Sequence, residues 1–114
     1  MNNACISPEK KRKLLSSLGL CARARALAVG APTVIEAVRV TGARAPRLVI
    51  EASDTSENTH KRISDKCAYY NVRHVRPDVS SAELSDAVGK SSSVAAVAVL
   101  DDNFLKLILQ YIED

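Results

Sequence analysis

Apolar side chains recur at helical spacing near the start of the chain. Leu14, Leu18 and Cys21 lie three and four residues apart, which predicts one buried face of a helix. Ser7 and Pro8 come just before this stretch, as a capping serine followed by a proline suited to the first helical position. The pattern therefore predicts an amphipathic helix that begins at Pro8.

The rest of the chain alternates between similar helical stripes and short apolar runs. Runs rich in Val, Leu, Ile and Ala, such as "VAAVAVL", predict buried strands. The predicted strands span residues 25–29, 47–53, 72–75 and 93–100. The predicted helices span residues 8–24, 30–42, 54–71, 80–89 and 101–112. This alternation predicts a three-layer α/β/α sandwich, with helices on both faces of a small sheet.

Residues suited to helix ends stand at several predicted boundaries. Gly42 and Gly89 lie where a helix would close in a left-handed conformation, and Asn71 ends the helix between them. Ser80 and Glu83 have the spacing of a capping box, in which each side chain bonds the backbone N–H of the other residue.

Length and composition narrow the class of protein. The chain has 114 residues, which favours a single domain over residues 1–114, and its 46% of apolar residues is ordinary for a globular protein. We identify no run long enough to span a bilayer and no targeting segment, so we expect a cytoplasmic protein that does not enter a membrane. A net charge of +3 favours a polyanionic partner, although only weakly.

The residues that most often carry chemistry are poorly placed for it. Cys5, Cys21 and Cys67 are too far apart for a metal site or redox pair, so we expect reduced thiols that fill the core. His60 and His74 have no carboxylate or cysteine at ligand spacing, and we interpret both as exposed polar residues. We therefore expect no catalytic residue, no metal and no cofactor.

The segment "GKS" resembles part of a phosphate loop. That motif requires a further glycine five places before Gly89, where this chain has Leu84. The segment also ends a predicted helix, whereas a phosphate loop begins one. We therefore exclude nucleotide hydrolysis.

The start of the second predicted helix is the strongest candidate for a binding site. Gly30 follows a predicted strand and opens the helix, so the backbone N–H groups of its first turn are available to an anion. Arg23 and Arg25 precede the same strand and Arg39 lies on the helix, so we expect them to gather near this helix end.

Four stretches of the chain then resemble a known family. They are "KLLSSLGLCARARALAVG", "RLVIEASDTSENTHKRISDKCAYYNV", "SAELSDAVGK" and "VAAVAVLDDNFLKLI". Together they resemble the L-seven-Ae and L-thirty-e ribosomal protein family, and in particular its small bacterial YlxQ-type branch, from about residue 10 to residue 108. The block around "SDTSENT" is the most discriminating part.

The resemblance implies a fold and a ligand. It implies a four-stranded mixed sheet within the sandwich, and binding to kink-turns, which are sharply bent RNA junctions. Family members meet RNA at the start of the second helix and at a loop that corresponds here to residues 76–81, where aliphatic side chains cover a splayed base. Carried onto this chain, and with the three arginines above, the implied RNA-binding residues are Arg23, Arg25, Gly30, Ala31, Pro32, Thr33, Glu36, Arg39, Arg76, Val79, Ser80 and Ser81.

The chain departs from the family at the positions that read bases. The family's helix carries Asn, Glu and Lys where this chain has Pro32, Thr33 and Glu36. Proline offers no donor, threonine loses a carboxylate, and Glu36 replaces a cation with an anion that Arg39 can pair at i+3. Losing two base contacts at roughly 1–3 kcal/mol each predicts markedly weaker kink-turn recognition.

Two hypotheses follow for the function. The first is a non-catalytic, ribosome-associated RNA-binding protein, monomeric, whose partner is a kink-turn or related bent RNA such as ribosomal RNA, with ribosomal particles as a further partner. The second is a protein-interaction module that keeps the fold and has lost kink-turn base recognition.

Overall fold

The computed structural model describes residues 2–4 and 6–112. Its helices are α1 (Pro8–Arg23), α2 (Ala31–Ala37), α3 (Glu57–Tyr69), α4 (Ser81–Val88) and α5 (Asp102–Ile112). Its strands are β1 (Asn2–Ala4), β2 (Leu27–Val29), β3 (Leu48–Glu51), β4 (His74–Pro77) and β5 (Ala96–Val99). A short 3-10 turn covers Gly42–Arg44.

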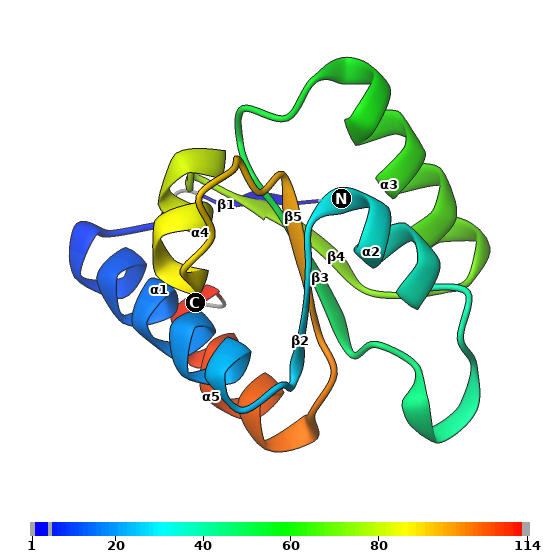
Figure 1. Ribbon diagram of the computed structural model, residues 1–114, viewed down its shortest axis with the longest axis horizontal. Coiled ribbons are helices and arrows are strands. Elements are labelled where there is room, and N and C mark those ends of the chain that lie inside the picture. Colours follow the sequence, from blue (N-terminus) through cyan, green and yellow to red (C-terminus); the bar gives the residue numbers. More distant parts are fainter. Residues whose placement is uncertain (1, 5, 113–114) are drawn as a thin grey trace.

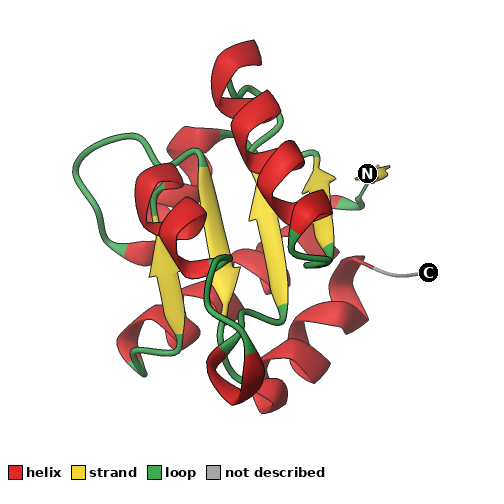
Figure 2. Ribbon diagram, turned by 90° about the vertical axis from the view of Figure 1, so that its right-hand side faces the viewer, coloured by secondary structure: helices red, strands yellow, loops and turns green. Residues whose placement is uncertain are grey.

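The strands form one mixed sheet in the order β1-β4-β3-β5-β2. β5 runs antiparallel to both β2 and β3, whereas β3 and β4 are parallel. Helices α2 and α3 cover one face, and α1, α4 and α5 cover the other, as Figures 1 and 2 show. This confirms the predicted three-layer α/β/α sandwich. The four expected strands are joined by β1, a three-residue edge strand parallel to β4 that the pattern did not predict.

Two apolar clusters hold the layers together. Leu48, Ile50 and their neighbours pack against α1, α4 and α5, whereas Val49 and the smaller Ala96 and Ala98 face α2 and α3. Successive residues of a strand point to opposite faces, so β3 and β5 must be apolar at almost every position. That requirement explains the apolar runs in the sequence. No helix among the described residues has the length and apolarity needed to cross a bilayer.

The strand directions place several loops at the same end of the sheet. β2, β3 and β4 all finish where β5 begins, so Gly30, the loop 52–56, the loop 78–80 and the loop 90–95 lie together. Helices α2 and α4 both begin at this end, which is the upper end in Figure 1. The fold therefore brings the two segments that the family resemblance assigns to RNA to one edge.

Some predicted boundaries are confirmed and others are wrong. Gly89 closes α4 with a φ of 75°, and Asn71 follows α3 with a φ of 56°. Gly42 does not close α2, which ends at Ala37, and instead opens the 3-10 turn with a φ of 80°. The strand predicted over residues 72–75 lies two residues later.

Candidate nucleic-acid interface

The start of α2 is open. Gly30 has a φ of 96° and donates its N–H to the Ala96 carbonyl at 2.9 Å, which ties the end of β2 to β5. Among the described residues no side chain caps the helix, and a Cβ added at Gly30 would meet nothing within 4 Å. Pro32 and Thr33 are exposed. The first-turn N–H groups of Ala31 and Thr33 therefore have neither an acceptor within the helix nor a capping side chain from the described chain, while Pro32 contributes no N–H.

The inner face of α2 fixes this orientation. Val34, Ile35 and Val38 are buried in the cluster that joins α2 to α3 and the sheet. Proline at the second helical position is already in helical geometry, so the first turn forms without a capping side chain. As a result, Thr33 and Glu36 are left on the solvent side.

The start of α4, by contrast, is closed by side chains. Ser80 and Glu83 form the predicted capping box, with the Ser80 N–H donating to Glu83 Oε1 at 2.9 Å and the Glu83 N–H donating to Ser80 Oγ at 3.1 Å. Ser81 donates from its N–H and its hydroxyl to the Asp54 carboxylate, at 2.8 and 3.2 Å. Two carboxylates thus occupy the position where a phosphate would have to bind.

Val79 also cannot play the role that the resemblance implies. Its side chain is 1% exposed and packs in the core beneath α4, and its carbonyl accepts the Ser53 N–H at 2.8 Å. An aliphatic side chain that covers a splayed base has to be at the surface. The expected contact through Val79 is therefore wrong for this conformation.

Arg76 is directed inward, toward the loop after β3. Its guanidinium donates to the carbonyls of Ala52, Ser53 and Thr55 at 3.2, 3.1 and 3.4 Å. It also lies 3.4 Å from the Glu51 carboxylate. Arg76 thus fixes the shape of the loop 52–56 instead of presenting its charge to solvent.

Sequence reasoning missed the buried cluster beneath this loop. Glu51 is fully buried at the end of β3, where its carboxylate lies 2.8 Å from His60 Nδ1 and 2.8 Å from His74 Nε2. Burial opposes the charged form, but hydrogen bonds from His74 and His60 and the charges of those rings hold the pKa of the Glu51 carboxyl below its ordinary value. The interpretation of His60 and His74 as exposed, unpartnered residues is wrong.

A signal for this cluster was present in the sequence. Glu51 lies in a run that was predicted to be buried, and a buried carboxylate requires partners. The partners lie nine and 23 residues further on, so helical or strand spacing alone could not identify them. Within the described residues, no group of three His, Cys, Asp or Glu side chains is arranged to hold a metal ion.

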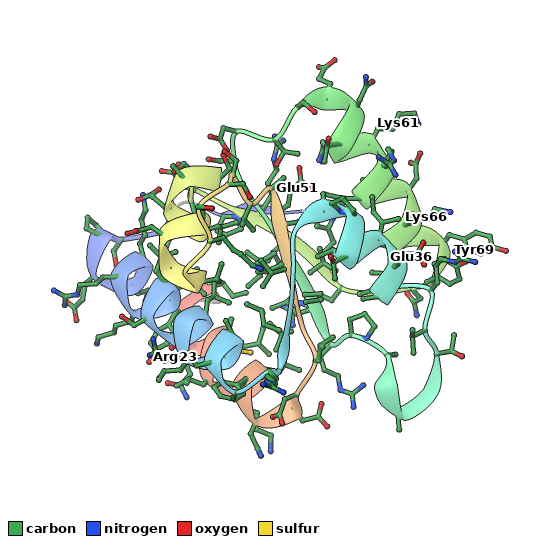
Figure 3. The ribbon with its side chains drawn as sticks, viewed as in Figure 1. Arg23, Glu36, Glu51, Lys61, Lys66 and Tyr69 are labelled. Atoms are coloured by element: carbon green, nitrogen blue, oxygen red, sulfur yellow. The ribbon has the colours of Figure 1, made fainter. Side chains whose placement is uncertain are left out.

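The three predicted arginines do not gather at the start of α2. Arg25 precedes β2 and Gly30 follows it, so the two residues lie at opposite ends of this strand. Arg23 ends α1 and lies at the lower end of the molecule in Figure 3. Arg39 lies beyond the other end of α2 and pairs with Glu36 at 3.4 Å, as the spacing predicted.

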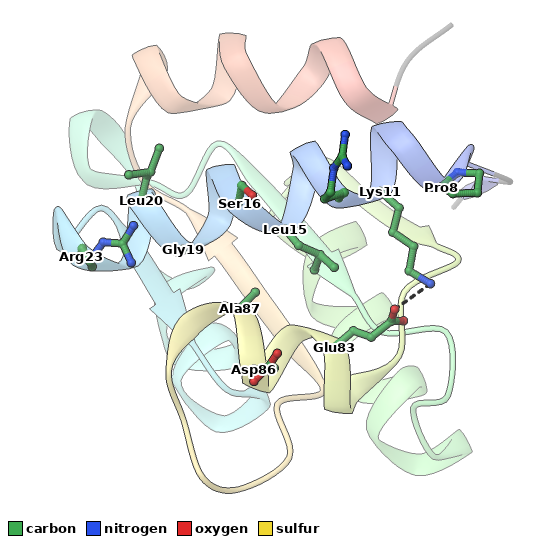
Figure 4. Close-up of a pocket in the computed structure, with 11 residues that line it drawn as sticks. Pro8, Lys11, Leu15, Ser16, Gly19, Leu20, Arg23, Glu83, Asp86 and Ala87 are labelled. Atoms are coloured by element: carbon green, nitrogen blue, oxygen red, sulfur yellow. Dashed lines mark ion pairs between the residues drawn. The ribbon is translucent and has the colours of Figure 1, made fainter.

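Arg23 instead lines a groove between α1 and α4, shown in Figure 4. The groove has a volume of about 760 Å³ and an apolar floor that includes Leu15 and Gly19. Lys11 on its α1 side pairs with Glu83 on its α4 side at 2.8 Å. None of its lining residues is a histidine or a cysteine.

The cysteines of the described chain fit the predicted structural role. Cys21 and Cys67 are buried and free, and burial is the main cause that raises the pKa of each thiol to about 11. Protonated, inaccessible thiols are poor nucleophiles and poor metal ligands. Cys5 lies outside the described residues.

Two curated proteins are similar to this chain over most of its length. RNA-binding protein YlxQ of Bacillus subtilis (strain 168) is 38% identical over 96 residues, covering 84% of this chain and 91% of that protein. RNA-binding protein YlxQ of Enterococcus faecium is 33% identical over 103 residues, covering 90% and 94%.

Solved structures share the fold. A protein of unknown function from Bacillus halodurans C superimposes with a TM-score of 0.76 at 34% identity, covering 90% of this chain and 98% of that one. The 15.5kD RNA binding protein of Giardia lamblia superimposes with a TM-score of 0.69 at 20% identity, covering 93% and 87%. As the sequence resemblance predicted, a model of the Ribosomal protein L7Ae/L30e/S12e/Gadd45 family matches residues 12–109, and the chain belongs to this family.

Proposed function

We propose that this chain is an RNA-binding protein that receives distorted RNA at the start of α2. The observation that carries the proposal is the open first turn of α2, with Gly30 uncapped and Pro32 and Thr33 exposed. Unsatisfied N–H groups at a helix start attract phosphate. Relatives that are named RNA-binding proteins support RNA as the source of that phosphate.

The ligand we propose is bent RNA of the kink-turn type, with ribosomal RNA as the first candidate. Regular A-form RNA has a deep, narrow major groove that excludes protein, so a helix end reaches bases only where the duplex is distorted. Pro32, Thr33 and Glu36 cannot make the base contacts expected of Asn, Glu and Lys. We therefore propose that the protein recognises backbone shape more than base identity, as a monomer that acts in the cytoplasm on ribosomal particles.

The test is a salt-titrated binding assay with three RNAs of equal length: a kink-turn, a bulged duplex and a straight duplex. The kink-turn should bind most tightly, and its affinity should fall as salt rises. Equal affinity for kink-turn and straight duplex at moderate salt would refute the proposed ligand. The triple variant Pro32→Asn, Thr33→Glu, Glu36→Lys should gain kink-turn selectivity if the scaffold is right and only the reading residues have changed.

The groove between α1 and α4 favours a second candidate, a protein-interaction module. Lys11, Arg12 and Arg23 form one wall and Glu83 and Asp86 the other. A wall of each charge around an apolar floor suits a partner helix with charged flanks. Co-purification after nuclease treatment separates the two functions. A partner that remains bound without RNA, and that Arg12→Glu releases, supports the protein-interaction module. Loss of every partner together with the RNA supports the RNA-binding protein.

A further inference from the structure

The outer face of α3 carries two free cations and, next to them at the end of the helix, an aromatic ring. Arg62, Lys66 and Tyr69 follow one another at i, i+4 and i+7, which places them on one face of the helix. All three side chains are exposed, and Tyr69, at 80%, is the most exposed large hydrophobic residue of the described chain. Figure 3 shows Lys66 and Tyr69 directed outward on the side of the molecule where Glu36 also lies.

The Tyr69 ring is supported by its neighbour. Tyr70 lies edge-on to Tyr69, with ring centroids 4.8 Å apart and an interplanar angle of 82°. Tyr70 in turn packs against the buried cluster beneath α2 and α3. One side of the exposed ring is thus held by a residue that is fixed in the fold, so the remaining surface can receive a planar group at a low cost in side-chain entropy.

The charged side chains on the outer face of α3 that have no ion-pair partner in the described chain are positive. Lys61 is paired with Asp65 at 3.0 Å, one turn along the same helix. Arg62 and Lys66 form no ion pair with any described residue. A partner for this face must therefore be anionic, and it must offer a flat surface to an exposed tyrosine.

We infer that the outer face of α3 is a second RNA contact, which holds a single-stranded segment flanking the distorted duplex bound at α2. Tyr69 stacks on an unpaired base, and Arg62 and Lys66 contact the phosphates beside it. From Arg62 to Tyr69 the helix rises about 10 Å, the length of a few nucleotides. Stacking on an aromatic ring beside cations is how proteins bind single strands with little regard to sequence. This inference rests on the proposed function.

The position of α3 makes the two contacts continuous. α3 packs against α2, on which Glu36 stands in place of a free lysine and pairs with Arg39 just beyond the end of the helix. Free cationic side chains, which α2 lacks, are thus present on the neighbouring helix α3. An RNA that leaves the α2 start in single-stranded form can follow α3 without passing another layer of the molecule.

The experiment compares a kink-turn RNA with blunt ends, the same RNA with a short uridine tail, and the tail strand alone. The wild-type protein should bind the tailed RNA about tenfold more tightly than the blunt RNA. Tyr69→Ala should abolish that preference, whereas Tyr69→Phe should keep it because the ring remains. Arg62→Gln with Lys66→Gln should lower the dependence of log affinity on log salt by about 1.4 for the tailed RNA only. Lys106→Gln, an exposed lysine on α5, is the control for loss of charge elsewhere.

The outcomes separate this inference from the proposed function. Equal wild-type affinity for tailed and blunt RNA, or a tail preference that Tyr69→Ala leaves intact, overturns the α3 contact while kink-turn binding stands. Tail-strand binding that requires Tyr69, with nothing added by the kink-turn, supports the α3 contact and refutes the proposed ligand at α2.

Discussion

Helices α2 and α4 begin at the same end of the sheet but differ in how their first turns are satisfied. At α4, Ser80, Glu83 and Asp54 supply side-chain partners to the first backbone groups. At α2, Gly30 supplies none, and a Cβ added at Gly30 would meet nothing within 4 Å. The family resemblance assigns both segments to RNA, yet only at the start of α2 does no described side chain bond the first-turn N–H groups.

The difference separates structural from functional roles along one edge. The start of α4 is tied to the loop 52–56, and that loop is held by Arg76 above the buried Glu51 cluster. A segment with so many internal bonds is costly to open. A helix start that is complete except for its first N–H groups is, by contrast, preorganised for a ligand.

The largest expected effect comes from removing the buried carboxylate beneath the loop 52–56, to which the start of α4 is bonded. Glu51→Ala leaves Arg76, His60 and His74 without their shared acceptor, which should lower the free energy of unfolding by about 3–5 kcal/mol. Urea unfolding at neutral pH measures this loss. Glu57→Ala, an exposed glutamate on α3, is the control and should change stability little. A loss below about 1 kcal/mol for Glu51→Ala would mean that the cluster does not hold the loop.

The same cluster predicts a dependence on pH. Because the folded pKa of Glu51 is lowered, its contribution is complete above the ordinary carboxylate pKa and is lost as pH falls from there through the depressed value. The wild-type protein should therefore lose stability on acidification more steeply than Glu51→Ala. Unfolding curves with parallel pH dependence would contradict this.

A glycine comparison tests whether the open helix start matters for RNA. Gly30→Ala and Gly89→Ala both place a side chain at positive φ in open space, so each should cost about 1–3 kcal/mol of stability. Only Gly30→Ala should also weaken RNA binding, because Gly89 lies at the far end of α4. Equal affinities for the two variants, measured under folding conditions, would remove α2 from the interface.

A pair of aspartate variants tests directly the role of the start of α4, where side chains bond the first N–H groups. Asp54→Ala removes the carboxylate that bonds Ser81 and should cost about 1 kcal/mol, whereas Asp78→Ala removes an exposed carboxylate of the neighbouring loop and should leave stability unchanged. Both should raise RNA affinity slightly, because each removes a negative charge from this end. A fall in affinity with Asp54→Ala would show that the α4 segment contacts RNA after all.

The smallest expected effect comes from reversing one charge on α2. Glu36→Lys should raise RNA affinity by about threefold and increase the salt dependence by about one phosphate contact. Its effect on stability should be small, because the pair with Arg39 is exposed. Glu36→Gln should give an intermediate affinity, and filter binding over a range of salt concentrations resolves the series.

Features that depend on residues close together in the sequence were predicted more accurately than contacts between residues far apart in it. The capping box at Ser80, the closing Gly89 and the opening Gly30 follow from residues within one turn, and the structure has all three. The prediction that Gly42 closes the second helix was wrong, because α2 ends earlier, at Ala37. A glycine suited to a helix end also suits a 3-10 turn, which is where Gly42 lies.

The errors around β4 have one physical origin. Whether Val79, Arg76 or His74 faces solvent depends on what packs against β4, and its strand neighbours lie elsewhere in the sequence. A two-residue shift in the predicted strand was enough to turn Arg76 from a loop residue into part of the buried support. The misplacement of Arg25 has a different, local cause, because residues that flank one strand lie at its opposite ends.

The most direct test of the central claim follows the backbone amides of the intact protein by NMR while kink-turn RNA is added. The account predicts that the amide resonances of Ala31 and Thr33 shift most, and that those of Ser80 and Ser81, whose N–H groups are already bonded to Glu83 and Asp54, stay in place. Large shifts at Ser80 and Ser81 with none at Ala31 and Thr33 would contradict it.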